Sequence, residues 1–184
     1  MNPTTRFNRG SDNNFQTLWE DGDRVFSRRW RPTADGSRST VLAVSPAAER
    51  PSPASLDRLI HEYGLKDDLD GTWAARPLEL IREGDRTTLL LEDSGGEPLD
   101  LRAAAPMEVG RFLHLAISTA AALGKLHERG LVHKDIKPVN LLVNHDTGSV
   151  KLTGFGIASR LPRERQAPAP PEFIAMLPPI VQAS

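Results

Sequence analysis

One short segment of this sequence gathers the residue types that phosphoryl transfer needs. Residues 133–140 read HKDIKPVN and place a carboxylate, an ammonium group and an amide close together. Phosphoryl transfer needs a carboxylate that accepts a proton from the attacking hydroxyl, a cation beside the phosphate, and an oxygen ligand for the bridging metal. Asp135, Lys137 and Asn140 supply one of each. Taken alone, the segment could also be a surface turn of mixed charge.

The elements that position this segment can be predicted from hydrophobic patterning. Between residues 17 and 44, two runs of β-prone residues flank the turn-rich PTADGSR, which is typical of antiparallel strands. Apolar residues between 56 and 63 follow the i, i+3, i+4, i+7 spacing of one helix face. Ser52 or Ser55 can cap the start of that helix.

A hairpin and a longer helix follow. Residues 76–94 have the pattern of two strands around a turn at Glu83-Gly84-Asp85, and residues from about 106 to 127 keep the 3.6-residue apolar period for five turns. Two strand-like runs, 131–143 and 149–155, then flank a turn. This order of strands, helix, strands, helix and hairpin predicts an α+β fold.

The composition excludes several classes of protein. The net charge is -1, so there is no basic excess to attract nucleic acid, and we expect no nucleic-acid partner. Because cysteine is absent, disulfides, thiolate metal sites and cysteine nucleophiles are excluded. The most apolar stretch, 113–124, is too short to span a membrane. The polar start lacks the apolar run of a secretory signal, so we expect a cytoplasmic protein without membrane insertion.

Three motifs resemble those of serine/threonine protein kinases. LHERGLVHKDIKPVNLLV is similar to their helix and catalytic loop, LTGFGIASRL to their metal-binding turn, and LLLEDSGGEPLD to their hinge. Lys137, two residues after the aspartate, matches the serine/threonine version of the loop. Over roughly residues 17–175, the sequence resembles the N-terminal kinase-like domain of large bacterial signalling proteins. Those proteins continue into an ATPase-like module, a GAF domain and a sensor histidine kinase.

The resemblance implies a protein-kinase-like α+β fold, with a small antiparallel-sheet lobe followed by the first part of the helical lobe. We expect a disordered lead over 1–15, the small lobe over 16–93 and a partial large lobe with the catalytic loop over 94–161. Residues 162–184 would be a proline-rich, truncated activation segment and tail. Without the rest of a helical lobe, the helix near 106–127 should leave much of its apolar face uncovered.

On the phosphate side, the resemblance implies a role for each matching residue. Asp135 would be the catalytic base, Lys137 the contact to the γ-phosphate of ATP, and Asn140 a ligand of Mg²⁺. His133 would be structural and pack against Phe155.

On the adenine side, the implied contacts come from the hinge and from the strand after the catalytic loop. Leu142 would be the floor under the adenine, and Leu91 would close the back of its site. Backbone groups of Glu92 and Ser94 would face the edge of the base. For the apolar positions, plain core packing is an equally good interpretation.

Two parts of the usual nucleotide site are missing from the first strands. The glycine-rich loop should hold closely spaced glycines, but between residues 17 and 44 only Gly22 and Gly36 occur. The strand lysine should fall near Val41–Ser45, yet the first lysine of the chain is Lys66. Arg38, near the empty lysine position, is the candidate substitute for that lysine.

The metal-binding turn also departs from the family pattern. The usual Asp-Phe-Gly reads Gly154-Phe155-Gly156, so the aspartate that holds magnesium is replaced by glycine. Glu62, in the first helix, would be the acidic partner of the missing lysine. Without that partner, we expect its carboxylate to be solvated on the face of the helix.

These observations favour one function and leave an alternative open. The chain is expected to be a serine/threonine kinase-like domain that transfers phosphate from ATP to protein serine or threonine, with activity that is weak or lost. The alternative is an inactive pseudokinase-type module that regulates or docks a partner signalling domain. ATP, Mg²⁺ and a protein substrate or partner are the ligands that the resemblance implies.

Overall fold

The computed structural model describes residues 15–32, 38–99 and 107–161. Two of the predicted regions, most of the lead and the tail from 162 onward, lie outside the described residues. The division of the chain at residues 93 and 94 stays a prediction.

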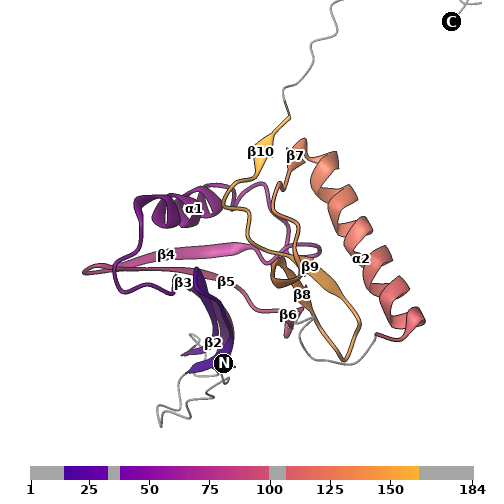
Figure 1. Cartoon of the computed structure of the whole chain (residues 1–184), viewed down its shortest axis with the longest axis horizontal. Coiled ribbons are helices and arrows are strands. Elements are labelled where there is room, and N and C mark those ends of the chain that lie inside the picture. Colours follow the sequence, from indigo (N-terminus) through magenta and orange to yellow (C-terminus); the bar gives the residue numbers. More distant parts are fainter. Residues whose placement is uncertain (1–14, 33–37, 100–106, 162–184) are drawn as a thin grey trace, which may run out of the picture.

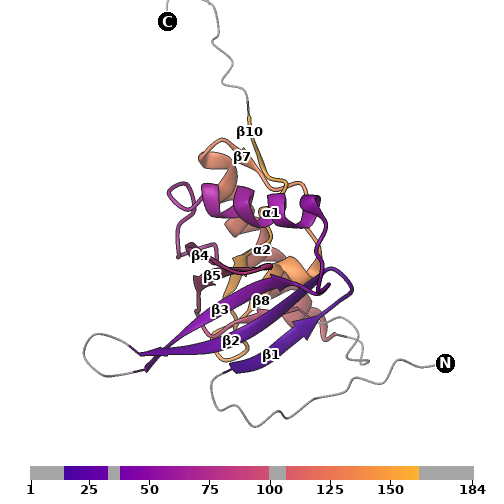
Figure 2. The same cartoon turned by 90° about the vertical axis from the view of Figure 1, so that its left-hand side faces the viewer.

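The first half of the chain forms a five-stranded antiparallel sheet with α1 on one face (Figure 1, Figure 2). The strands predicted between 17 and 44 and the hairpin at 76–94 are confirmed. Along the sheet the order is β1 (Phe15–Glu20), β2 (Arg24–Pro32), β3 (Arg38–Pro46), β5 (Arg86–Glu92) and β4 (Pro77–Glu83).

Helix α1 (Pro53–Gly64) begins where the sequence predicts. The hydroxyl of Ser52 accepts a hydrogen bond from the backbone N–H of Ser55, and Pro53 occupies the first turn, where its missing N–H costs nothing. The helix packs on β4 and β5 and buries Leu59 and Glu62. It therefore carries a carboxylate toward the interior, as well as an apolar side chain.

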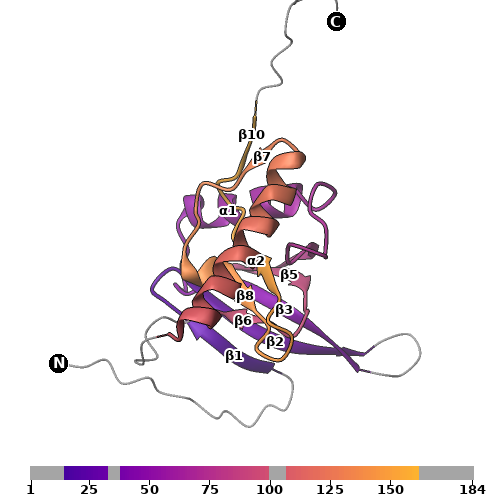
Figure 3. The same cartoon turned by 90° about the vertical axis from the view of Figure 1, so that its right-hand side faces the viewer.

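The second half of the chain is built around α2 (Val109–Glu128) and short strands. Helix α2 packs against β9 and β7 (Figure 3), and the carboxylate of Glu108 caps its start by accepting from the N–H groups of Gly110 and Arg111. The remaining elements are β6 (Glu97–Pro98), β7 (Leu131–Val132), the 3₁₀ turn η1 (Pro138–Asn140), β8 (Leu141–Val143), β9 (Val150–Leu152) and β10 (Ser159–Arg160). Strands β6, β8 and β9 form one small sheet, and β10 pairs with β7.

One apolar cluster joins the two halves. It combines small-lobe residues from β2, β3, β5 and α1 with Val139 and Leu142, which flank the end of the catalytic loop. Backbone hydrogen bonds make a second connection: the N–H of Ala75 donates to Leu152 O, and the N–H of Leu152 donates to Trp73 O, both at 2.9 Å. The catalytic loop is thus held at fixed positions against the sheet.

Helix α2 leaves an apolar face exposed, as predicted. Its four large apolar residues on this face expose between 51% and 69% of their surface: Val109, Phe112, Leu113 and Ile117. Neither helix in the described ranges is long and apolar enough to cross a membrane.

Candidate active site

The three residues predicted to do chemistry lie together in the loop between β7 and β8. The ammonium group of Lys137 is 3.0 Å from Oδ2 of Asp135. The Asn140 amide donates to the same Oδ2 at 3.0 Å and to the backbone carbonyl of Asp135 at 2.6 Å. Carboxylate, cation and amide therefore form one hydrogen-bonded group, which is the arrangement that the spacing predicts.

His133 holds this loop from beneath, and its predicted packing against Phe155 is confirmed. The two ring centroids are 4.6 Å apart. Nε2 of His133 donates to the carbonyl of Thr153 at 3.0 Å, while its Nδ1 accepts from the backbone N–H of Asp135 at 3.2 Å. Burial lowers the pKa of His133, so the neutral ring that makes these two bonds is favoured.

The Asp135 carboxyl group is kept ionised by its neighbours. Partial burial raises its pKa, but hydrogen bonds from Lys137 and Asn140 and the charges of Lys137 and Arg24 outweigh burial, so its pKa lies below the ordinary value. An ionised carboxylate in a half-buried loop can accept a proton from a hydroxyl.

The expectation of a solvated Glu62 is wrong. Its side chain exposes only 3% of its surface, and Oε1 accepts a hydrogen bond from the backbone N–H of Gly154 at 2.9 Å. Burial raises the pKa of Glu62, although the Gly154 hydrogen bond and the charge of Arg24 act in the opposite direction. The carboxylate has a backbone partner in the Gly154-Phe155-Gly156 turn in place of the lysine that the sequence lacks.

Arg24 contacts the amide of Asn140, a role that the sequence did not predict. It is the first residue of β2, and its Nη2 donates to Oδ1 of Asn140 at 2.8 Å. The guanidinium also lies over the ring of Phe26, 5.5 Å from the centroid. The only available signal was strand alternation, which places Arg24 and Phe26 on the same face of β2.

Arg38, considered above as a substitute for the lysine, does not reach this site. It pairs with Pro32 at the far end of the β2–β3 ladder and is exposed. The stretch where the lysine should fall, Val41 to Val44, is buried and apolar.

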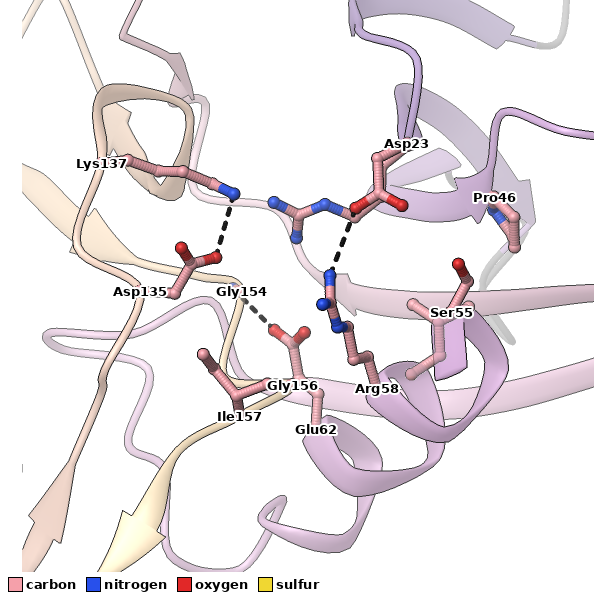
Figure 4. Close-up of a pocket in the computed structure, with 12 residues that line it drawn as sticks. Asp23, Pro46, Ser55, Arg58, Glu62, Asp135, Lys137, Gly154, Gly156 and Ile157 are labelled. Carbon is pink, nitrogen blue, oxygen red and sulfur yellow. Dashed lines mark hydrogen bonds and ion pairs between the residues drawn. The ribbon is translucent and has the colours of Figure 1, made fainter. Parts of the chain in front are cut away.

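A cavity of about 240 Å³ lies between the loop, α1 and the β1–β2 turn. Figure 4 shows Asp135 and Lys137 on one side of it and the Asp23–Arg58 ion pair on the other, with Glu62 reaching up toward Gly154. The cavity wall holds three cations and three carboxylates, namely Arg24, Arg58, Lys137, Asp23, Glu62 and Asp135. None of the four residues predicted to contact adenine lines it.

Those four residues lie in the core or in the hinge. Leu91 and Leu142 are 0% and 1% exposed and belong to the apolar cluster that joins the lobes. The N–H of Glu92 donates to Arg76 O, and the carbonyl of Ser94 accepts from the side chain of Asn144 at 3.1 Å. Their contact with a nucleotide stays a prediction.

The hinge is also tied directly to β2. Nε of Arg28 is 2.6 Å from Oδ2 of Asp93, and its Nη2 donates to the carbonyl of Gly96 at 3.1 Å. The side chain of Asp93 is only 1% exposed, so this ion pair is largely withdrawn from water. Removing either partner would leave a buried charge, which is costly.

Comparison with known proteins agrees with this architecture. The family described as the protein kinase domain matches residues 45–175. The serine/threonine-protein kinase PknA of Mycobacterium tuberculosis is 36% identical over 138 residues, which are 74% of this chain and 26% of PknA. The serine/threonine-protein kinase pkn2 of Myxococcus xanthus is 30% identical over 105 residues, which are 55% of this chain and 13% of pkn2.

The chain belongs to the protein kinase domain family. It spans about a quarter or less of the length of these relatives. The family match begins at residue 45, near the end of β3, so it leaves out most of the first three strands, which lack the glycine-rich loop and the lysine.

The cofactors of this family, ATP and Mg²⁺, do not fit the residues in the arrangement that kinases use. Oδ1 of Asn140, the expected metal ligand, already accepts from Arg24. A Cβ atom at position 154 would lie 2.6 Å from Cγ of Asn140, so the space of the missing aspartate is filled. Leu142 has almost no exposed surface on which a base could rest.

A substitution of Glu62 should change how stability depends on pH. A raised pKa means that folded Glu62 keeps its proton to higher pH than unfolded Glu62, whose ordinary value is 4.5. Stability therefore falls as the pH rises from about that value through the raised pKa. Glu62→Gln keeps the acceptor for Gly154 and removes the titration. Urea unfolding at several pH values should show that the free energy of unfolding of the variant, relative to that of the wild type, increases as the pH rises.

The matched control is Glu128→Gln, at an exposed position on α2. Its stability profile should run parallel to that of the wild type. If the stability of Glu62→Gln relative to the wild type does not change with pH, or falls as the pH rises, the assigned role of burial is contradicted.

A side chain at position 154 should destabilise the fold. Gly154 has φ +80°, and an added Cβ meets the buried amide of Asn140. Gly154→Ala should therefore cost about 1–3 kcal/mol in urea unfolding, through strain and displacement of Asn140. Gly124→Ala, in the middle of α2 with open space around it, should instead stabilise by roughly 0.5–1 kcal/mol. Equal stability of Gly154→Ala and the wild type would contradict the crowding at this turn.

Proposed function

We propose that this chain is a serine/threonine kinase-type domain in which transfer of phosphate from ATP is weak or lost. Its retained role is that of a pseudokinase-type module that regulates or docks a partner signalling domain. The observation that carries the proposal is the apolar cluster at the adenine side. Leu142, the expected floor, is 1% exposed and packs in one cluster with Leu91, Phe26 and Leu42.

The phosphate side supports the same proposal. The buried β3 stretch offers Val44 where a lysine is needed, and Gly154 offers no side-chain oxygen to a metal. In kinases these two groups neutralise charge that develops during transfer. We expect the loss of both to cost several kcal/mol of transition-state stabilisation, and each 1.36 kcal/mol is about a tenfold change in rate.

A second candidate function is favoured by one observation, the intact catalytic loop. Asp135 is ionised and hydrogen-bonded to Lys137 and Asn140. If ATP entered, Asp135 would accept the proton of a serine or threonine hydroxyl, and Lys137 would neutralise the transferring phosphate. This activity would be that of a slow kinase on a protein substrate.

The setting of the domain is part of the proposal. The matched relatives are much longer than this chain, which supports a role beside other domains. We place the domain at the N-terminal side of a large bacterial signalling protein in the cytoplasm, next to ATPase-like, GAF and sensor kinase modules. Its partner is then one of those modules or a protein that they act on.

Thermal unfolding with and without millimolar ATP and Mg²⁺ tests the proposal. A ligand that binds only the folded state at 100 times its dissociation constant adds about 2.7 kcal/mol of stability, which is readily detected. We expect no shift of the unfolding midpoint. A phosphotransfer assay with Asp135→Asn as control should give equal, background rates for both proteins.

The opposite pair of results would overturn the proposal in favour of the second candidate. These results are a stabilisation by ATP that depends on Mg²⁺, and a transfer rate that Asp135→Asn abolishes.

A further inference from the structure

Three residues of β2 face the site that a nucleotide takes in kinases. Arg24, Phe26 and Arg28 alternate along the strand, so they share one face. In the β2–β3 ladder they pair with Pro46, Val44 and Leu42. Arg24 reaches the catalytic loop, Phe26 enters the apolar cluster beside Leu142, and Arg28 reaches the hinge.

Arg24, the first of the three, is hydrogen-bonded to the catalytic loop. The Arg24 guanidinium donates to Oδ1 of Asn140 at 2.8 Å, and it lies over the Phe26 ring. Asn140 is completely buried, so this oxygen has little access to water. The charge of Arg24 also acts on both nearby carboxyl groups: it adds to the hydrogen bonds that lower the pKa of Asp135, and it opposes in part the burial that raises the pKa of Glu62. A cation that bonds this amide oxygen and lies near two carboxyl groups takes the position and the charge that a bound metal ion would have.

The turn before Arg24 is stabilised by the carboxylate of Asp21, which lies within the turn. One oxygen of Asp21 accepts hydrogen bonds from the backbone N–H groups of Asp23 and Arg24, both at 2.8 Å. These two amides belong to the turn between β1 and β2, where kinases carry the glycine-rich loop that binds phosphate. A carboxylate on the same chain thus takes the hydrogen bonds that a phosphate oxygen would need.

We propose that the segment Asp21–Arg24 is an internal substitute for metal and phosphate. In this substitute, Arg24 replaces the metal ion at Asn140 and Asp21 replaces a phosphate at the turn amides. The small lobe is thereby latched to the catalytic loop without a ligand, and Arg24 excludes divalent cations from the site. The inference deepens the proposed function, on which it rests, because it names what holds the inactive site closed.

Removing the guanidinium should open the site to a divalent cation. In Arg24→Ala, Oδ1 of Asn140 loses its hydrogen-bond donor, and the carboxyl groups of Asp135 and Glu62 lose a nearby positive charge. Titration of the full chain with Mn²⁺ alone, followed by electron paramagnetic resonance, should show at least tenfold tighter binding to Arg24→Ala than to the wild type. Adding Asn140→Ala to Arg24→Ala should remove that gain.

Arg29→Ala is the matched control, because Arg29 is an exposed arginine on the opposite face of the same strand. It should bind Mn²⁺ no better than the wild type. Arg24→Met, which keeps most of the side-chain stem, serves as a second variant if Arg24→Ala does not fold. Equal Mn²⁺ affinity of the wild type and the folded Arg24 variant would overturn the inference, as would equal gains from Arg24 and Arg29 variants.

This titration contains no nucleotide, so its outcome is independent of phosphotransfer. Stabilisation of the wild type by ATP and Mg²⁺, together with phosphotransfer that Asp135→Asn abolishes, would overturn the proposed function. If the wild type and Arg24→Ala bind Mn²⁺ with equal affinity, only the inference about Asp21–Arg24 is overturned.

Discussion

The buried amide of Asn140 is the group on which the rest of this site depends. Its nitrogen donates to the carbonyl and the carboxylate of Asp135, and its oxygen accepts from Arg24. Its side chain also fills the space above Gly154. The catalytic loop, the first sheet and the Gly154-Phe155-Gly156 turn therefore meet at one side chain that has no contact with water. A change at any of the three affects the other two through this amide.

The same constraint supports the proposal that phosphoryl transfer by this domain is weak or lost. The loop geometry satisfies Asp135, Lys137 and Asn140 among themselves. The partners that would make them productive, a strand lysine and a metal-binding aspartate, are absent from the sequence. Arg24 instead donates to Asn140, and Glu62 accepts from Gly154, while Phe26 and Leu42 contribute to the apolar cluster around Leu142. These contacts form without any ligand, which is consistent with the proposed regulatory role.

Local patterns were sufficient to predict most of the elements. Turn residues and strand periodicity located the first sheet, and capping by Ser52 located α1. The candidate catalytic residues could be predicted to meet because they lie within one short loop. The packing of His133 on Phe155 followed from the family resemblance. Strand β10 was missed because two residues, Ser159 and Arg160, carry no pattern apart from their pairing with β7.

The contacts that decide the function are those that join distant parts of the chain. Glu62 and Gly154 are separated by 92 positions, and Arg24 and Asn140 by 116. No local rule distinguishes a helix carboxylate that faces water from one that bonds a distant turn, so Glu62 was assigned to the wrong environment. Arg24 likewise looks like any charged residue at the start of a strand until the catalytic loop is folded against it.

The most direct test of this account is an NMR titration of the wild-type chain with ATP and Mg²⁺. The backbone N–H signals of Gly154, Glu92 and Ser94 report on the metal turn and on the hinge. If the chain's own side chains occupy the place of the nucleotide, these three signals should show no saturable change up to millimolar ATP. Saturable shifts at the hinge amides, dependent on Mg²⁺, would contradict the account.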